Sequence, residues 1–247
     1  MLSGNLGHDS NKDHFEKVYY VLSYPRSGNT WMRYILENIT AYKSFGYARI
    51  NPDVDGKPIS DHLPEDFWDD TGVIRKRHLW EQGEPKPGPK EQRVAFLVLR
   101  NPVDLAARGA IPNNAGKAKY MDLLFHWNNL TCKKALITYD SLLLEPEKVI
   151  RWLPDFLGLS DEAKARAEDF IVNLESHKQR SIGRADQATA VRVDSAIEKA
   201  GLVEQQIVDT LNSFNGLGRS HDNEFKILKD IFMPGTGNRL TMLDKSR

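Results

Sequence analysis

Three short apolar runs in this chain each end in a polar loop that leads into a helical pattern. The runs are Val18–Ser23, Val94–Leu99 and Ala135–Thr138, and they are rich in aliphatic and aromatic residues. The run at 94–99 is unbroken, as is typical of strands that are buried on both faces of a parallel sheet. Strands that alternate with helices predict an α/β fold, with a central parallel β-sheet flanked by helices.

The chain length suits one such domain. The sequence has 247 residues, of which 40% are hydrophobic, and it shows no internal linker. We therefore expect residues 1–15 to form a flexible N-terminal arm and residues 16–247 a single domain. No stretch approaches 18 consecutive apolar residues, and the polar start lacks the apolar core of a signal peptide. These features predict a cytoplasmic protein that does not bind membranes.

Charge and cysteine content exclude several further classes. The 34 Lys and Arg residues balance 34 Asp and Glu residues, which argues against a general nucleic-acid binder. The single cysteine, Cys132, rules out an internal disulfide and any cysteine-based zinc site. We expect a small-molecule partner, no nucleic acid, no metal, and a monomer or homodimer.

The first polar loop, Tyr24–Trp31, reads YPRSGNTW and has the composition of a phosphate-binding loop. In parallel sheets ligands bind beyond the carboxyl ends of the strands. Gly28 lets the backbone approach a ligand, Arg26 adds a cation, and the following helix N-terminus offers free N–H groups. The other hydrogen-bonding side chains of the loop are Ser27, Asn29 and Thr30. The loop lacks the Gly-Lys-Ser/Thr ending of ATP-binding P-loops, and its residues would also suit an ordinary strand–helix turn.

Three segments together resemble the cytosolic-type sulfotransferases, which use 3′-phosphoadenosine 5′-phosphosulfate (PAPS). YPRSGNTW resembles their 5′-phosphosulfate loop, and Leu97–Asp104 resembles their 3′-phosphate segment. Thr138–Leu143 is similar to their Tyr-Glu-Asp-Leu segment, and the three occur in the family order. The resemblance spans residues 18–158, whereas the last ninety residues match weakly. It implies a P-loop-like sulfotransferase fold, PAPS as donor, adenosine 3′,5′-bisphosphate (PAP) as product, and a hydroxyl or amine of a small molecule as acceptor.

The resemblance also implies a catalytic group. His78 follows the apolar segment Val73–Arg77 and precedes Arg100 by 22 residues, close to the family spacing between the catalytic His and the 3′-phosphate Arg. A neutral imidazole there would take the proton of the acceptor. Arg26 stands where the family usually has Lys, and it would stabilise charge on the leaving phosphate. Lys76 would assist, or it is a solvated cation at a strand end.

Further residues are implied to bind the nucleotide. The resemblance places Trp31 and Tyr139 against adenine, although Trp31 would equally suit core packing. Arg100 would bind the 3′-phosphate, or it forms a salt bridge with Asp104.

The chain departs from the family in two places. Arg108 stands eight residues after Arg100, where the family usually has Ser. Arg108 either meets the 3′-phosphate or points away from it. Arg180 and Arg184, which flank Gly183, are the best match to the C-terminal Arg-Lys-Gly segment, with 234–237 as a later rival.

Two other functions remain open at this level. A nucleotide kinase-like phosphotransferase has the same strand–loop–helix plan, although the sequence shows no obvious metal-binding Asp after a second strand. A non-catalytic nucleotide-binding protein of the same fold is the other alternative. The acidic stretch 53–70 is either a solvated loop or a wall that favours a cationic or polar acceptor.

Overall fold

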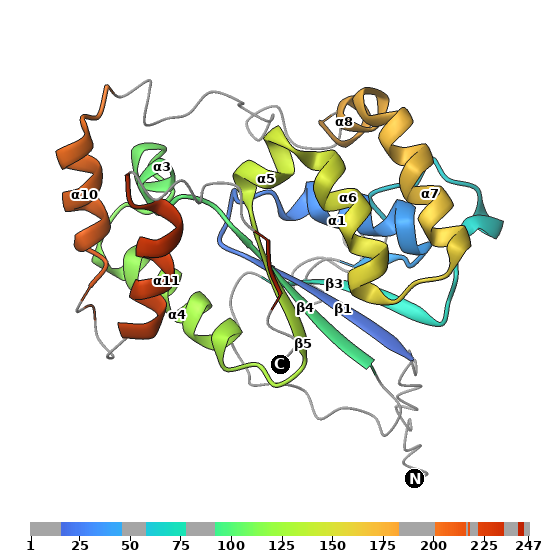
Figure 1. Ribbon diagram of the computed structural model, residues 1–247, viewed down its shortest axis with the longest axis horizontal. Coiled ribbons are helices and arrows are strands. Elements are labelled where there is room, and N and C mark those ends of the chain that lie inside the picture. The colour runs from blue at the N-terminus through green and yellow to red at the C-terminus, as the bar shows by residue number, and fades with distance from the viewer. Residues whose placement is uncertain are drawn as a thin grey trace, which may run out of the picture.

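The computed structural model is built around one central sheet with helices on both faces (Figure 1). It describes residues 16–45, 58–77, 92–182, 201–215, 217, 222–234 and 242–244. The strands are β1 (Lys17–Ser23), β2 (Ser44–Phe45), β3 (Gly72–Arg77), β4 (Gln92–Leu99), β5 (Lys133–Thr138) and β6 (Met242–Asp244). The α-helices are α1 (Asn29–Thr40), α3 (Pro102–Ala107), α4 (Asn114–Asn128), α5 (Tyr139–Leu144), α6 (Pro146–Leu157), α7 (Asp161–Val172), α8 (Leu174–Ile182), α10 (Glu204–Asn212) and α11 (Asp222–Phe232).

The sheet has the strand order β2-β3-β1-β4-β5-β6. All pairs are parallel except β5 with β6, which is antiparallel. The predicted α/β fold with a central parallel sheet is therefore confirmed, and β6 is an addition that the sequence pattern did not reveal. The boundary between an arm and the domain stays a prediction, because residues 1–15 lie outside the described part of the chain.

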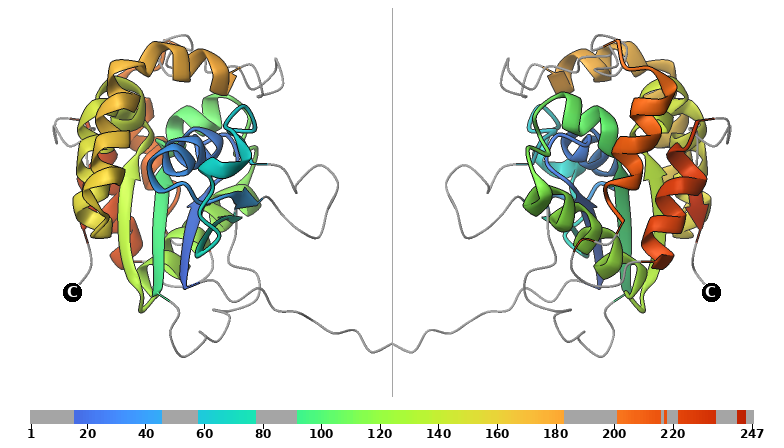
Figure 2. Two further views of the ribbon diagram at one scale, coloured as in Figure 1. Left: turned by 90° about the vertical axis from the view of Figure 1, so that its right-hand side faces the viewer. Right: turned by 90° about the vertical axis from the view of Figure 1, so that its left-hand side faces the viewer.

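Two apolar layers bury the sheet, one on each face. Alternate residues of β1 show the division, since Tyr20 and Leu22 face one cluster and Tyr19 and Val21 face the other. The first cluster is completed by residues of α3, α4, α10 and α11, and the second by residues of α1, α6 and α7. The side views of Figure 2 show the sheet between these two helical layers. Such burial on both faces explains the unbroken apolar run of β4.

The topology brings the loops that follow three strands together at one end of the sheet. β1 lies between β3 and β4, so the chain leaves β1 toward one side and later returns on the other. The carboxyl ends of the parallel strands are level there, because Ser23 pairs with Val98 and Leu99 pairs with Thr138. Ligands of open α/β sheets bind at such a reversal point. The loops that follow β1, β4 and β5 are therefore the first place to look for a site.

No helix in the described part of the chain is both long and apolar enough to cross a bilayer. Likewise, the described residues contain no cluster of three or more His, Cys, Asp or Glu side chains that would hold a metal ion.

Candidate phosphate-binding site

The loop between β1 and α1 has the strained backbone of a ligand-binding turn. Arg26 and Gly28 both have left-handed backbones, with φ of 66° and 86°. Gly28 is the N-cap of α1, and no side chain caps the helix there. The first N–H groups of a helix have no partner within it, so this end offers donors and a partial positive charge to an anion. Strain of this kind in a non-glycine residue is common at ligand sites.

Asn29 fixes the loop to the sheet. Its amide Nδ2 donates to the Val21 carbonyl oxygen at 2.9 Å and to Ser23 Oγ at 3.1 Å. The side chain therefore points back to β1 and holds the start of α1 against the strand. Its Oδ1 atom is buried without a hydrogen-bond partner.

Ser27 and Arg26 occupy opposite environments in the same loop. The Ser27 side chain is buried, and its Oγ atom has no hydrogen-bond partner among the described residues. The Arg26 side chain is exposed, and Thr30 is half-buried. A buried hydroxyl without a partner costs about 1–3 kcal/mol, so Ser27 Oγ destabilises the fold as it stands.

Arg100 links this loop to the loop that follows β4. Its Nη1 atom donates to the Arg26 carbonyl oxygen at 2.8 Å, and its Nε atom donates to Asp104 Oδ2 at 2.6 Å. Its own carbonyl oxygen accepts from the Tyr120 hydroxyl at 2.6 Å. The side chain is 9% exposed. The salt bridge that the sequence left open as an alternative therefore exists, and Arg100 also holds the strained carbonyl of the phosphate loop.

Arg108 points toward the same carboxylate. Its Nε atom lies 3.0 Å from Asp104 Oδ2, so two guanidinium groups converge on one acid. Asn101 starts the helix between them, since its side chain accepts from the Val103 N–H and Pro102 occupies the first turn. Arg100, just before the N-cap of α3, and Arg108, at its C-cap, therefore both contact Asp104 in the first turn of the helix. The departure at Arg108 adds a cation beside Arg100 instead of pointing it elsewhere.

Tyr139, which follows β5, lies against both of the other loops. Its ring lies under the Arg100 guanidinium, 4.2 Å from the ring centroid. The ring also lies against Gly28, because a Cβ atom at that position would stand 2.8 Å from Tyr139 Cδ2. Burial raises the pKa of the Tyr139 hydroxyl, against the smaller lowering effect of Arg100 and Arg108. The hydroxyl therefore stays neutral at physiological pH.

The structure separates other predicted site residues from this cluster. Trp31 is buried among Tyr34 and Phe170, with ring centroids 5.8 and 5.9 Å away, and its indole N–H donates to the Leu142 carbonyl oxygen at 3.3 Å. Such contacts are those of a core residue, and its adenine contact stays a prediction. Lys76 is half-buried on β3, opposite Val21.

Three predicted site residues lie away from this cluster or outside the described part of the chain. Arg180 lies on α8 and lines a cavity beside α1 and α7. His78 and Arg184 lie outside the described residues. β3 ends at Arg77, next to Leu22 of β1, so the strand before His78 ends level with the phosphate loop.

Sequence reasoning missed the role of Asp104 as a shared partner, together with the pocket residues His62 and His177. Asp104 carried a signal, because it stands four residues from both Arg100 and Arg108, the spacing of neighbours on a helix. The spacing of Arg166, Phe170, Asn173, His177 and Arg180 likewise follows helical periodicity and would have put these side chains on one face.

Comparisons with known proteins agree with the fold. Over 88% of this chain and 91% of the other, the structure is similar to mouse sulfotransferase SULT7A1 complexed with PAP, with a TM-score of 0.52 and 17% sequence identity. Retinol dehydratase in complex with androsterone and the inactive cofactor PAP gives a TM-score of 0.44 at 13% identity, over 87% of this chain and 81% of that one. No family model matches the sequence, and no curated protein matches it. At this identity the first likeness establishes a shared fold.

Proposed function

We propose that this protein transfers a sulfuryl group from PAPS to a hydroxyl or amine of a small-molecule acceptor. The observation that carries the proposal is the pair Arg100 and Arg108, held side by side by Asp104 next to a helix-N-terminal phosphate loop. A nucleotide with phosphates at both its 5′ and 3′ positions needs two separate anion sites. The loop with Arg26 supplies one, and the arginine pair supplies the other.

The residues present fit such a nucleotide. Gly28 lets the Tyr139 ring pack directly against the loop backbone, and the buried Ser27 Oγ atom lacks a partner among the described residues. The Nη2 group of Arg100 makes no hydrogen bond with a described residue, since its Nε and Nη1 atoms make the contacts that are seen. These donors suit phosphate oxygens. The nucleotide would supply the sulfuryl group, and Arg26 with the helix N–H groups would stabilise charge on its 5′-phosphate as the acceptor attacks.

The acceptor proton needs a base, and we assign that role to His78. The assignment is supported by the resemblance of its segment and by the end of β3 at the same edge of the sheet as the loop. Lys76, on that strand, is the proposed assistant. Tyr139 and Trp31 are proposed to contact adenine, and Arg180 and Arg184 remain candidates for closing over the nucleotide. Sulfuryl transfer of this kind needs no metal, and the expected setting is a cytoplasmic monomer or homodimer.

A donor comparison tests the proposal. The protein is incubated with a panel of phenols, alcohols and amines and with either PAPS or adenosine 5′-phosphosulfate, which lacks the 3′-phosphate. Two charged contacts to that phosphate should be worth roughly 3 kcal/mol, so PAPS should be used about a hundredfold better.

Three other results would point to different functions. Equal use of the two donors would show that the arginine pair does not bind the 3′-phosphate. Tight ATP binding with phosphoryl transfer would establish the kinase alternative. Selective PAP binding with no transfer to any acceptor would establish a non-catalytic nucleotide-binding protein.

A further inference from the structure

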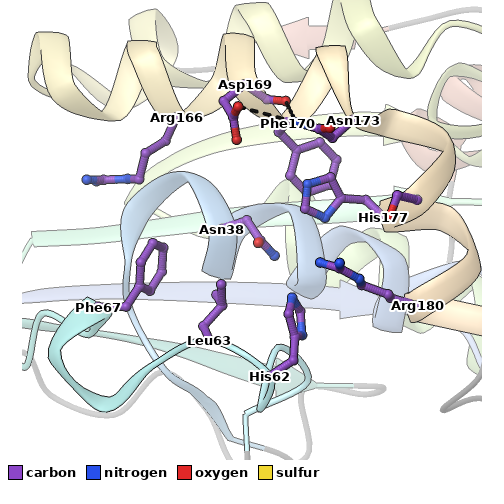
Figure 3. A pocket seen from close by; sticks show the side chains of 11 residues that line it. Asn38, His62, Leu63, Phe67, Arg166, Asp169, Phe170, Asn173, His177 and Arg180 are labelled. Carbon is purple, nitrogen blue, oxygen red and sulfur yellow. Dashed lines mark hydrogen bonds between the residues drawn. The ribbon is translucent and has the colours of Figure 1, made fainter.

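A cavity of about 350 Å³ lies beside the C-terminal half of α1, away from the phosphate loop (Figure 3). Its walls come from α1, α7, α8 and the segment 58–68. None of its lining residues belongs to the loop after β1 or to α3. Asn38 lies ten residues beyond Gly28, which is about 15 Å along the helix axis. A volume of this size suits a ligand of one or two rings.

The wall opposite α7 is held in place by buried hydrogen bonds. The Glu37 carboxylate is fully buried and accepts from the backbone N–H groups of Ile59 and Ser60, at 2.9 and 2.6 Å. Asn38 Nδ2 donates to Ser60 Oγ at 2.8 Å. These bonds fix the chain two residues before His62, which lines the cavity. The cavity is therefore preformed, as ligand pockets usually are.

Flat rings line its interior. The Phe170 and His177 rings stack with centroids 4.0 Å apart and an interplanar angle of 3°. His177 Nδ1 lies 3.0 Å from the Tyr34 hydroxyl, which fixes the imidazole. Phe67 and Leu63 face them from the other side of the cavity (Figure 3). A cavity with the Phe170–His177 stack on one wall and Phe67 and Leu63 on the other favours a planar ring between the two walls.

Arg180 supplies the positive charge at one end. It lies near both histidines, and its charge, after burial, lowers the pKa of His62 and lowers that of His177 to about 4. Both imidazoles are therefore neutral at pH 7, and no described carboxylate forms a salt bridge with Arg180.

Of the other charged groups of the cavity, Arg166 is paired with an acid, whereas Asp169 keeps its negative charge and binds a neutral amide. Arg166 donates to the Ile39 carbonyl oxygen at 2.9 Å and pairs with Glu162 at 3.1 Å. Asp169 accepts from Asn173 on the α7 side (Figure 3). The end of the cavity at Arg180 consequently favours an anion.

We propose that this cavity is a second ligand site that binds a small aromatic anion, with its ring against Phe170 and His177 and its carboxylate or sulfonate at Arg180. The inference shares one residue with the proposed function, because Arg180 is also a candidate for closing over the nucleotide. The experiment therefore measures both naphthoate binding and PAP binding.

The test uses calorimetric titration of the full chain with 2-naphthoate and with the neutral 2-naphthylmethanol. The anion should bind at least about tenfold more tightly than the alcohol. Arg180→Gln should weaken naphthoate binding by about fivefold, the effect of one exposed ionic contact, and leave alcohol binding unchanged. Lys178→Gln is the matched control, because it removes the same charge from α8 at a position that does not line the cavity. Its naphthoate affinity should match that of the unaltered protein.

A second arm separates this site from the nucleotide site. Naphthoate should bind with the same affinity when the protein is saturated with PAP. Displacement by PAP, together with weaker PAP binding in Arg180→Gln, would place the cavity in the nucleotide site and overturn the inference. Absence of naphthoate binding, or equal effects of Arg180→Gln and Lys178→Gln, would also overturn it. A protein that bound naphthoate but not PAP would contradict the proposed function alone.

Discussion

The two ends of α1 present two different kinds of binding surface. At its N-terminus, the ligand-facing groups come from one contiguous loop, 24–31, which meets Arg100 and Tyr139 across the sheet edge. Along its C-terminal half, the cavity is assembled from four segments between Asn38 and Arg180. A helix N-terminus attracts anions through its own backbone, whereas the cavity depends on side chains that only folding brings together. The first surface suits phosphate, and the second suits a ring with one charge.

The charges at the two ends differ in burial as well. Arg100 and Asp104 have side chains 9% exposed, so their interaction is strong and its loss leaves an uncompensated buried charge. The Arg166–Glu162 pair beside the cavity has an acid that is 82% exposed, and water screens it. The cluster of Arg100, Asp104 and Arg108 is therefore rigidly held, while the ionic contacts around the cavity contribute little to stability.

The largest expected effect concerns where the chemistry takes place. His78→Ala should lower turnover by about 10² to 10⁴-fold, the usual effect of losing a general base, with PAP affinity changed by less than about threefold. Steady-state kinetics with an identified acceptor measure the first quantity, and calorimetry measures the second. His126→Ala, on α4, is the control and should retain full activity. If turnover depended on His177 and not on His78, the reaction would belong to the cavity.

The next effect compares the two ionic clusters. Asp104→Asn should destabilise the protein by about 3 kcal/mol, because two arginines lose their shared buried anion. Glu162→Gln should leave the unfolding free energy unchanged within error. Urea unfolding of both variants checks the difference. Equal stability of the two variants would show that the arginine pair does not need its carboxylate.

A smaller effect tests the close contact at the phosphate loop. Gly28→Ala should cost about 1–2 kcal/mol in stability because its left-handed backbone is unfavourable for other residues, and PAP affinity should fall about tenfold as Tyr139 is displaced. Gly158→Ala is the control, since its φ is +66° and a Cβ atom there meets nothing within 4 Å. The Gly158→Ala variant should lose stability but keep its affinity for PAP. Unchanged PAP binding in Gly28→Ala would mean that Tyr139 is not part of the nucleotide site.

The smallest effect is a pH dependence at the cavity. Burial, then Arg180 and His62, lower the pKa of His177 to about 4, with a small opposing effect of Asp169. The unfolded chain therefore takes up this proton first as the pH falls below about 6.5, and stability decreases between that pH and about 4. His177→Gln should reduce this decrease between pH 7 and 5, as measured by urea unfolding. The same pH dependence in both proteins would show that His177 titrates normally.

The sequence predicted the parallel sheet and the strand–turn–helix segment at 18–40 because both depend on contiguous residues. An apolar run such as 94–99 and a Gly-containing turn before a helix are local patterns. The antiparallel β6 is only three residues long and lies far along the chain from β5, so no local pattern marks it. His62 and His177 had no motif, and their cavity exists only because Glu37 and Asn38 fix the segment that carries His62. Arg108 was ambiguous in sequence, and its direction depends on the position of Asp104 in the folded helix.

The most direct test of the account is the affinity for PAP compared with adenosine 5′-monophosphate, measured by calorimetry. PAP should bind about a hundredfold more tightly, because Arg100 and Arg108 are proposed to contact the 3′-phosphate that the monophosphate lacks. Arg100→Ala should remove most of that preference. Arg108→Ala should weaken PAP binding and leave monophosphate binding unchanged. Equal affinity of the unaltered protein for the two nucleotides would contradict the assignment of the arginine pair, and with it the proposed use of PAPS.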